Sequence, residues 1–430
     1  MTPEDQSKEM QVSGTQHELV ISEERLAERL ARLAEIGLRD DGALQRLPYS
    51  PEDRAAQDLL TTWLEAAGLT VWVDPAGNVF GRLEGTDPEA PAVLTGSHLD
   101  TQPGGGRFDG VAGVLASLEA LEAMREAGLR PRAAIELVSW AGEEGGGCFD
   151  VGVIGSRAMV GALTEQHLDL RCRHRGRTLR ELMRECGLDV DRLGEAERPE
   201  GSLAAVVELH IEQGPLLEEA GIQVGVVTAI AGNRRVPLTL RGRQAHSGGM
   251  PMAYRHDALT GVAELVLAAE AIATAKTDPP VVATSGFLQH APREIAMIPG
   301  RADLTLDVRC IAQDALEAAV AEIQQAARDI AERRGLELEL RDPWGTNPSP
   351  TDPAIVAVLR AACDALGISA TAMPSGASHD SMVLATRFPA GMLFVPSAGG
   401  ISHAPEEFTE TADLAAGARV LARALTVLSA

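Results

Sequence analysis

A histidine and two aspartates lie close together in the stretch from Thr95 to Gly110, TGSHLDTQPGGGRFDG. His98 and Asp100 are two residues apart after an apolar run, and in a strand this spacing puts both side chains on one face. A glycine turn then leads to Asp109, which precedes a helix-like pattern and so suits the N-cap position. The stretch predicts either a site at the carboxyl end of a strand or a capped helix with a buried histidine and a flexible turn.

Two further apolar runs also end in residues that could do chemistry. The run from Arg132 to Ala141 ends before Glu143 and Glu144, on a glycine-rich turn. Two adjacent acids after a buried strand are costly to desolvate unless a cation holds them, although a solvated loop would also explain them. A third buried strand, Leu203 to Ile211, carries His210 near its end.

Taken together, the strand ends supply three imidazoles and two carboxylates, a ligand mix that suits zinc or a similar divalent ion. The candidate ligands are His98, Asp109, Glu144, His210 and His403. One carboxylate can bridge two metals about 3.5–4 Å apart. Asp100 could then orient His98, and Glu143 could take a proton from a metal-activated water. Spacing alone does not pair ligands this far apart in the chain, so their grouping stays open at this point.

The elements that position these residues alternate between strand and helix patterns, which favours an α/β sheet. From about Thr228 the pattern changes to the order β-α-β-β-α-β of a ferredoxin-like unit. Its strands are expected at Val236–Arg243, Val281–Gln289, Ala302–Cys310 and Leu336–Arg341, and its helices at Arg255–Ala275 and Gln313–Arg334. A proline-rich boundary near residues 342–353 returns the chain to the first domain. We predict a mixed-sheet domain that carries the candidate di-metal site, with an inserted ferredoxin-like α+β domain.

The predicted boundaries divide the 430 residues into three parts. Residues 1–16 are polar and are expected to be disordered. The mixed-sheet domain comprises residues 17–227 and 342–430, and the inserted domain comprises residues 228–341.

Composition narrows the partners and the compartment. Lysine and arginine number 38 against 62 aspartates and glutamates, a formal charge of −24, which argues against nucleic acid and anionic membranes as partners. The five cysteines are scattered and contain no CxxC pair, which indicates a reducing, cytoplasmic compartment. No apolar run approaches the roughly 18 residues that a membrane span needs.

Five motifs resemble those of the M20 metallopeptidase group: HLDTQPGGGRFDG, AGEEGG, ELHIEQGP, GRQAHSGGMPMAYRHDAL and FVPSAGGISHAPEE. More narrowly, they are similar to its amidohydrolase branch, which includes N-carbamoyl-L-amino acid hydrolases, allantoate amidohydrolases and β-ureidopropionases. The histidine of HIEQGP favours this branch over the peptidases. The resemblance covers about residues 18–429 in the family order. It implies that the mixed-sheet domain is a di-metal hydrolase domain with two divalent metals per subunit, and that the inserted ferredoxin-like α+β domain is a lid and dimerisation domain.

The resemblance also implies a role for each site residue. One metal would take His98 and His210, the other Glu144 and His403, with Asp109 between them; Glu143 would be the general base and Asp100 the partner of His98. Gln213 matches a residue that faces the ureido group, and His246 matches a lid histidine that reaches the scissile carbonyl from the other subunit. Arg309 matches the arginine that binds the substrate carboxylate, although a salt bridge on the strand face would also explain it. His379, in SGASHDSM, matches a residue near the substrate or a structural one.

Two positions depart from the family pattern. The stretch PREIAMIPG has Ala296 where the family has an asparagine that contacts the substrate carboxylate, and Arg293 is a candidate replacement for that contact. Cys148 stands where the family usually has arginine. Both changes bear on the substrate more than on the chemistry.

The function that we expect is metal-dependent hydrolysis of the carbamoyl C–N bond of an N-carbamoyl-L-amino acid or related ureido acid by a homodimer. Zinc or manganese is the expected metal, with cobalt and nickel as further options. Allantoate, another ureido compound or an N-acyl amino acid is the nearest alternative substrate. A catalytically silent, metabolite-binding homologue is the alternative of another class; it would have lost the base or a ligand, and all of these residues are present here.

Overall fold

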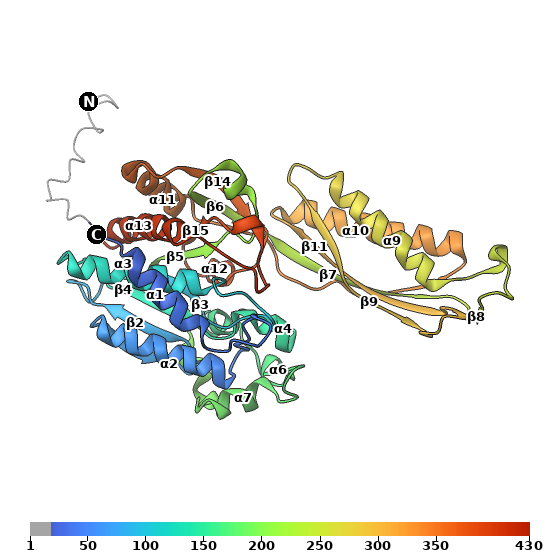
Figure 1. Ribbon diagram of the computed structural model, residues 1–430, viewed down its shortest axis with the longest axis horizontal. Coiled ribbons are helices and arrows are strands. Elements are labelled where there is room, and N and C mark those ends of the chain that lie inside the picture. The colour runs from blue at the N-terminus through green and yellow to red at the C-terminus, as the bar shows by residue number, and fades with distance from the viewer. Residues whose placement is uncertain (1–18) are drawn as a thin grey trace, which may run out of the picture.

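A computed structural model describes residues 19–430 of the chain. The predicted disordered segment, residues 1–16, lies outside the described residues. A large lobe holds the sheet and helices at both ends of the described chain, and a narrower, elongated lobe extends from it (Figure 1). The predicted α/β class, with a mixed sheet and an inserted α+β unit, is confirmed.

The large lobe is built on a nine-stranded mixed sheet. In spatial order its strands are β1 (Thr70–Val73), β2 (Val79–Leu83), β4 (Ile135–Trp140), β3 (Ala92–His98), β5 (Leu203–Ile211), β15 (Ala390–Val395), β6 (Val224–Ile230) and β13 (Ser349–Pro350), with β14 (Ala370–Ser375) also paired to β6. The four strands β4, β3, β5 and β15 are mutually parallel. Their carboxyl ends therefore meet along one edge.

Helices cover both faces of this sheet, and this explains why its central strands are apolar along nearly their whole length. One face packs against α1 (Glu23–Ala34), α2 (Pro51–Ala66), α3 (Val111–Glu126), α11 (Pro353–Leu366) and α13 (Thr411–Leu428). The other face packs against α5 (Ile154–Met159) and α12 (Asp380–Leu384). The remaining helices of this lobe are α4 (Gly146–Phe149), α6 (Glu165–Leu168), α7 (Leu179–Glu185) and α8 (Leu216–Ala220).

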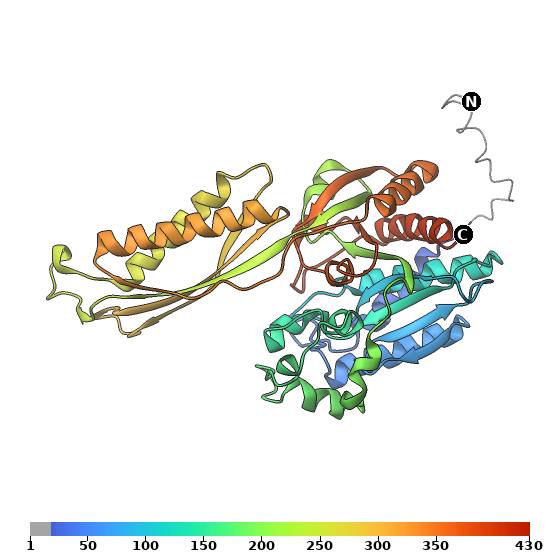
Figure 2. The ribbon, with the colours of Figure 1, turned by 180° about the vertical axis from the view of Figure 1, so that it is seen from behind.

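The elongated lobe, the lid, is a four-stranded antiparallel sheet in the order β12 (Glu337–Leu340), β7 (Gly232–Arg241), β11 (Arg301–Cys310) and β9 (Val282–Ala291). Two helices, α9 (Ala258–Thr274) and α10 (Gln313–Arg334), pack on one face through a separate apolar core. The order along the chain is the predicted β-α-β-β-α-β. A short ribbon of β8 (Ala245–His246) and β10 (Met297–Ile298) forms the far tip, seen from behind in Figure 2.

One local prediction is wrong: Asp109 is not the N-cap of α3. Gly110 occupies that position with a φ of 67° and no side-chain cap. A Cβ at Gly110 would lie 2.5 Å from the ring of His98, so glycine is required both by its backbone angle and by this close approach. The carboxylate of Asp109 turns away from the helix amides and toward histidines from other strands.

Candidate metal centre

The site lies where four parallel strands end side by side. His98 is the last residue of β3, and His210 is the penultimate residue of β5. Glu143 and Glu144 follow β4 in a short 3-10 turn, and His403 follows β15. Because β4, β3, β5 and β15 are adjacent, residues spread along the chain converge on this edge.

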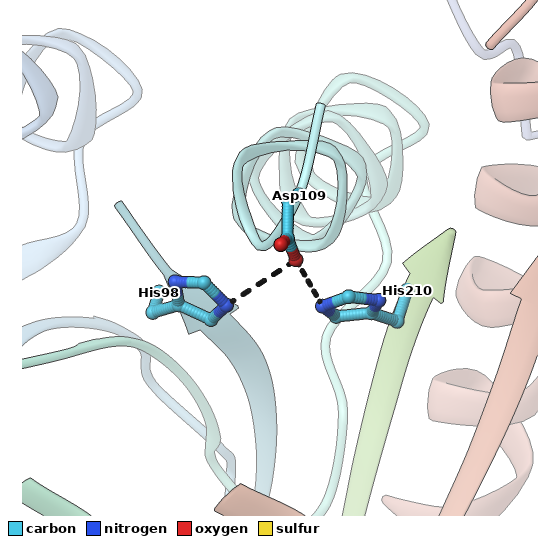
Figure 3. A group of neighbouring side chains, drawn as sticks. All are labelled: His98, Asp109 and His210. Carbon is cyan, nitrogen blue, oxygen red and sulfur yellow. Dashed lines mark ion pairs between the residues drawn. The ribbon is translucent and has the colours of Figure 1, made fainter. Parts of the chain in front are cut away.

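Asp109 lies at the centre of this group, between the rings of His98 and His210 (Figure 3). Its Oδ1 is 3.0 Å from His210 Nε2 and 3.7 Å from His98 Nε2. Its Oδ2 is 2.9 Å from His403 Nε2, which is itself 3.3 Å from Glu144 Oε1. Two three-residue groups therefore share Asp109: one with His98 and His210, the other with Glu144 and His403.

These spacings fit divalent metal binding. Two ligands held at about 2.1 Å from a tetrahedral ion lie about 3.4 Å apart, and the atom pairs above lie between 2.9 and 3.7 Å apart. A carboxylate with one oxygen directed at each group is the arrangement that bridges two ions. The donor set of imidazole nitrogens and carboxylate oxygens suits zinc or manganese.

Main-chain carbonyls set the orientation of two imidazoles. His98 Nδ1 lies 3.0 Å from the Asp100 carbonyl oxygen, and His210 Nδ1 lies 2.9 Å from the Ile211 carbonyl oxygen. Because a carbonyl only accepts, each Nδ1 carries a proton, which directs each Nε2 toward Asp109 and leaves it as the nitrogen that could bind a metal.

Asp100 contacts His98 differently from the side-chain pairing that we expected. Its carboxylate is 3.6 Å from His98 Nδ1, whereas its own main-chain carbonyl makes the hydrogen bond. The carboxylate instead accepts the amides of Glu143 at 3.2 Å and Glu144 at 2.9 Å. Asp100 thus connects the end of β3 to the turn that carries both glutamates.

The buried carboxylates of this site favour the binding of a cation. Burial raises the pKa of Glu143 well above its usual range, and nearby Glu144 and Asp380 raise it further. Burial, followed by the charge of Asp109, raises the pKa of Glu144 to about 7. Several buried carboxylates repel one another here, and a divalent ion would relieve that repulsion.

The pKa of each histidine depends on its distance from Asp109. Burial lowers the pKa of His98 to about 4. Burial also acts to lower the pKa of His210, but the hydrogen bond with Asp109 and the charges of Asp109 and Glu208 together outweigh it, and the pKa rises to about 9. A hydrogen bond to Asp109 likewise raises the pKa of His403 to about 9. Asp109 thus forms close ion pairs with His210 and His403.

Gln213, His379 and Arg309 lie at or near this centre. Gln213 Nε2 donates to Asp109 Oδ2 at 3.1 Å, and Gln213 has a φ of 57°, which is rare outside glycine and typical of functional sites. His379 is buried with its ring 4.6 Å from that of His210. Arg309 donates to the Gly376 carbonyl at 3.0 Å, next to the His379 loop, and also pairs with Asp307 at 3.0 Å on its own strand.

His246 and Arg293 are not brought to the centre within one chain. His246 lies on β8 and pairs with Met297 of β10, at the tip of the lid that points away from the large lobe (Figure 1). Arg293 lies in the exposed connection that precedes β10, close to Ala296, whose carbonyl accepts the Ser247 amide.

Sequence reasoning missed Glu407, whose carboxylate connects the loop that contains Asp109 to the loop that contains His403. Its carboxylate accepts the amides of Phe108 at 2.7 Å, Asp109 at 3.0 Å and His403 at 3.3 Å. It also accepts the hydroxyl of Ser402 at 2.8 Å. The available signal was a second acid four residues after His403, in the motif HAPEE.

The chain matches known proteins over nearly its whole length. Residues 94–427 match the model of peptidase family M20/M25/M40. An N-carbamoyl-L-amino acid amidohydrolase of Geobacillus stearothermophilus is 41% identical, with 94% of this chain and 97% of that protein covered. An allantoate amidohydrolase of Bacillus subtilis is 36% identical over 90% of this chain and 93% of that protein. The crystal structure of an amidase of the hydantoinase/carbamoylase family from Burkholderia multivorans superposes with a TM-score of 0.87 at 37% identity, covering 96% and 98% of the two chains.

The fold and the pocket define a metal-dependent hydrolase of carbon–nitrogen bonds other than peptide bonds. The chain belongs to peptidase family M20/M25/M40, on its amidohydrolase side. Across residues 19–430, no helix has both the length and the apolar character needed to cross a bilayer.

Proposed function

We propose that this amidohydrolase cleaves the carbamoyl C–N bond of an N-carbamoyl-L-amino acid or a related ureido acid. The observation that carries the proposal is Asp109, whose two oxygens face separate groups of ligands in a chain that is 41% identical to an N-carbamoyl-L-amino acid amidohydrolase. We also propose that the protein works in the cytoplasm. Its five cysteines are all free thiols, which supports a reducing compartment.

Two divalent ions, zinc or manganese, fit the site. His98, Asp109 and His210 would hold one ion, and Asp109, Glu144 and His403 would hold the other. When bound, such ions polarise the scissile carbonyl and make the attacking water more acidic.

Glu143 is the proposed general base. It lies in the turn after β4, with its Oε2 3.9 Å from His98 Nε2. Because burial raises the pKa of this carboxyl, the protonated form that Glu143 would take between the two proton transfers is stabilised. Oε2 would take the proton from the attacking water and pass it to the departing nitrogen of the substrate.

His246 is suited to donate a hydrogen bond to the oxyanion. Its Nδ1 accepts the amides of Gly248 and Gly249, both at 3.1 Å. A neutral imidazole with Nδ1 as acceptor carries its proton on Nε2, so Nε2–H is free to stabilise developing negative charge. Since the lid tip points away from its own site, we propose that His246 serves the site of a second subunit.

A homodimer is the assembly that this role requires. Strand β9 is the outer strand of the lid sheet, and it exposes the apolar side chains of Val282, Phe287 and Leu288. An unpaired edge with apolar side chains is prone to pair with another strand. We propose that two lids, each comprising residues 228–341, associate along this edge and that residues 17–227 and 342–430 form the catalytic domain.

Arg309 and Gln213 are the proposed contacts for the substrate. The guanidinium of Arg309 is partly exposed beside the Gly376 loop, and its planar fork suits a carboxylate. Gln213 faces the shared carboxylate Asp109, next to where the ureido group would bind. We also assign to the substrate-binding surface His379, beneath His210, and Arg293, from the lid tip.

A second candidate substrate class is allantoate, another ureido compound or an N-acyl amino acid. Ala296 removes an amide side chain that would contact a substrate carboxylate, so an amide substrate with a different acid group would also fit. The 36% identity to an allantoate amidohydrolase supports this alternative.

Product release decides between the candidates. The manganese- or zinc-loaded protein would be assayed against N-carbamoyl-L-amino acids, allantoate, ureidopropionate and N-acyl amino acids. Glu143→Gln serves as the inactive reference and Glu406→Gln, an acid near the site that binds no metal in this assignment, as the matched control. Turnover of a carbamoyl amino acid by the wild type and by Glu406→Gln, but not by Glu143→Gln, supports the proposal. A metal-loaded wild type that cleaves only allantoate or an N-acyl compound overturns the carbamoyl assignment in favour of the alternative.

A further inference from the structure

A buried arginine, Arg46, lies behind the metal centre. It is in the connection between α1 and α2 and is fully buried. Its guanidinium donates to three main-chain carbonyls: Nε to Leu99 at 2.8 Å, and Nη1 to Leu33 at 3.0 Å and Ile36 at 3.2 Å. Arginine is seldom fully buried, and here it contacts backbone from two separate parts of the chain.

The main chain around Arg46 runs along the segment that joins His98 to Asp109. The Arg46 amide donates to Thr101 Oγ1, and the Thr101 amide donates back to the Arg46 carbonyl, both at 2.9 Å. The Leu44 amide donates to the Gly105 carbonyl at 2.9 Å. Residues 44–46 therefore hold both ends of the stretch from Leu99 to Gly105.

That stretch orients the ligands themselves. The carbonyl of Asp100 holds His98 Nδ1, and its carboxylate holds the amides of Glu143 and Glu144. Leu99 and Thr101 are the residues of this stretch that contact Arg46, and they flank Asp100 on either side. A displacement of this short segment would therefore move His98 and Glu144 together, and these residues belong to different ligand groups.

Arg46 also supplies positive charge where acids are concentrated. Burial lowers its pKa to about 10, while the neighbouring carboxylates of Asp53, Asp100 and Glu407 act to raise it, so the side chain is charged at neutral pH. Asp100 and Glu407 are the two carboxylates whose hydrogen bonds hold the ligand loops. A buried cation near both carboxylates stabilises their charged forms.

The far end of the Arg46 contacts is rigid. Leu33 is in the last turn of α1 and Ile36 lies two residues beyond its end, where the carbonyls and the helix dipole favour a cation. Helix α1 is held on α3 by the ion pairs of Arg25 with Glu119 and of Arg29 with Glu122, at 2.7 and 2.6 Å. Arg46 thus connects the Leu99–Thr101 segment to a fixed helix.

We propose that Arg46 is a positioning residue of the metal centre: its guanidinium ties Leu99 to the end of α1 and its main chain pairs with Thr101, so that together they fix the segment Leu99–Thr101. This inference rests on the proposed metal-dependent function. Outer contacts of this kind typically change metal affinity or activity by about 10- to 100-fold when they are removed. Because Arg46 touches neither metal ligands nor substrate, its loss should lower metal affinity and kcat while KM changes little.

The test measures metal affinity directly, by competition of the full-length apoprotein with a chelator for Zn²⁺ and for Mn²⁺. Arg46→Lys keeps the charge but lacks the planar fork that reaches three carbonyls, and Arg46→Met loses both the charge and the donors. Thr101→Val removes the hydroxyl that accepts the main-chain amide of Arg46, so it loosens the same Leu99–Thr101 segment by a second route if Arg46→Met does not fold. Arg234→Met is the matched control, because it removes a mostly buried arginine of the lid strand β7 whose guanidinium also donates to main-chain carbonyls, those of Asn233 and Thr346.

We expect affinity for at least one ion to fall about 10- to 100-fold in Arg46→Met, less in Arg46→Lys and Thr101→Val, and to stay at the wild-type value in folded Arg234→Met. Equal affinities in wild type, Arg46→Lys and Thr101→Val would overturn the positioning role. A wild type that binds neither ion would instead overturn the proposed function. An equal loss in Arg234→Met would show that the effect is general destabilisation, and it would also contradict the inference.

Discussion

The two ends of the molecule organise their functional residues in opposite ways. At the strand-end edge of the large lobe, the candidate ligands are mostly buried, and the amides of Asp109 and Glu144 donate to carboxylates from distant parts of the chain. At the lid tip, His246 and Arg293 are exposed, and His246 is held only by the amides of its own turn. The apolar side chains around them, Met252, Tyr254 and Ile295, are exposed as well.

This difference teaches which parts of the catalytic machinery one chain can complete alone. A buried, hydrogen-bonded group has its geometry set by folding, because leaving its polar atoms unpaired would be costly. An exposed group on a two-stranded ribbon gains a defined position only when something covers it. Metal binding should therefore be a property of the single chain, whereas the lid contribution to turnover should depend on association.

The largest effect is expected at the buried end, from Glu143→Gln. Loss of a general base lowers kcat by about 10²- to 10⁴-fold. The substitution keeps the shape of the side chain, so both metal affinity and KM should stay close to the wild type. Steady-state kinetics on the metal-loaded protein and a chelator titration measure the two properties separately. Retained turnover in Glu143→Gln would remove this residue as the base.

His246→Ala should lower kcat by about 10²- to 10³-fold, the cost typical of losing one oxyanion donor. Metal affinity should not change, since the residue lies at the far tip of the lid. His256→Ala is the control, because His256 is in the same lobe and contacts only the Arg334 carbonyl through Nδ1. A kcat of His246→Ala equal to the wild-type value would contradict a catalytic role for the exposed lid tip.

A mixing experiment tells whether His246 acts across subunits. In a dimer of one Glu143→Gln chain and one His246→Ala chain, a single site would have both groups if the lid reaches the partner. Random reassociation of the two inactive variants should restore about a quarter of wild-type activity, since half of the dimers are mixed and each has one complete site. No recovery in verified mixed dimers would place His246 at the site of its own chain.

Much of the buried end could be read from the sequence because its elements have strong local signals. The strand Leu203–Ile211 and the helix Gln313–Arg334 have the bounds that the sequence predicts, since one is continuously apolar and the other strongly periodic. The metal-ligand motifs follow strands that are apolar on both faces. Parallel strands with a βαβ pattern place such motifs at one edge.

The parts that could not be read depend on packing rather than on local pattern. Strands β6 and β14 were not assigned; β14 contains Pro374 and is largely exposed, so it is a strand only through its pairing with β6. The N-cap prediction for Asp109 failed because histidines from other strands compete for its carboxylate. Arg46 has no sequence signal, and the acid pair of HAPEE does not show that Glu407 contacts Phe108 and Asp109, which lie 299 and 298 residues away.

Association of the lids can be weakened by a substitution that lies at neither the metal centre nor the lid tip. Phe287→Glu would place a charge on the exposed edge strand β9. If this strand is the dimer contact, losing an apolar anchor worth about 2 kcal/mol weakens dimerisation about 30-fold. Sedimentation over a concentration series measures this, with Val427→Glu, an exposed apolar residue of α13, as the control. Metal affinity should persist in the monomer, whereas kcat should fall with the dimer fraction.

The smallest effect is expected from Arg293→Ala at the lid tip. An exposed arginine that contacts a substrate carboxylate contributes about 1 kcal/mol, so KM should rise about fivefold with kcat nearly unchanged. Arg328→Ala, an exposed arginine on α10, controls for the loss of positive charge. The effect should appear for substrates with a carboxylate and vanish for the corresponding amides, because the contact is an ion pair. An equal rise in KM for both kinds of substrate would mean that Arg293 shapes the tip rather than binding the acid, and Arg309 would then be the only arginine left to recognise the carboxylate among those assigned to the substrate.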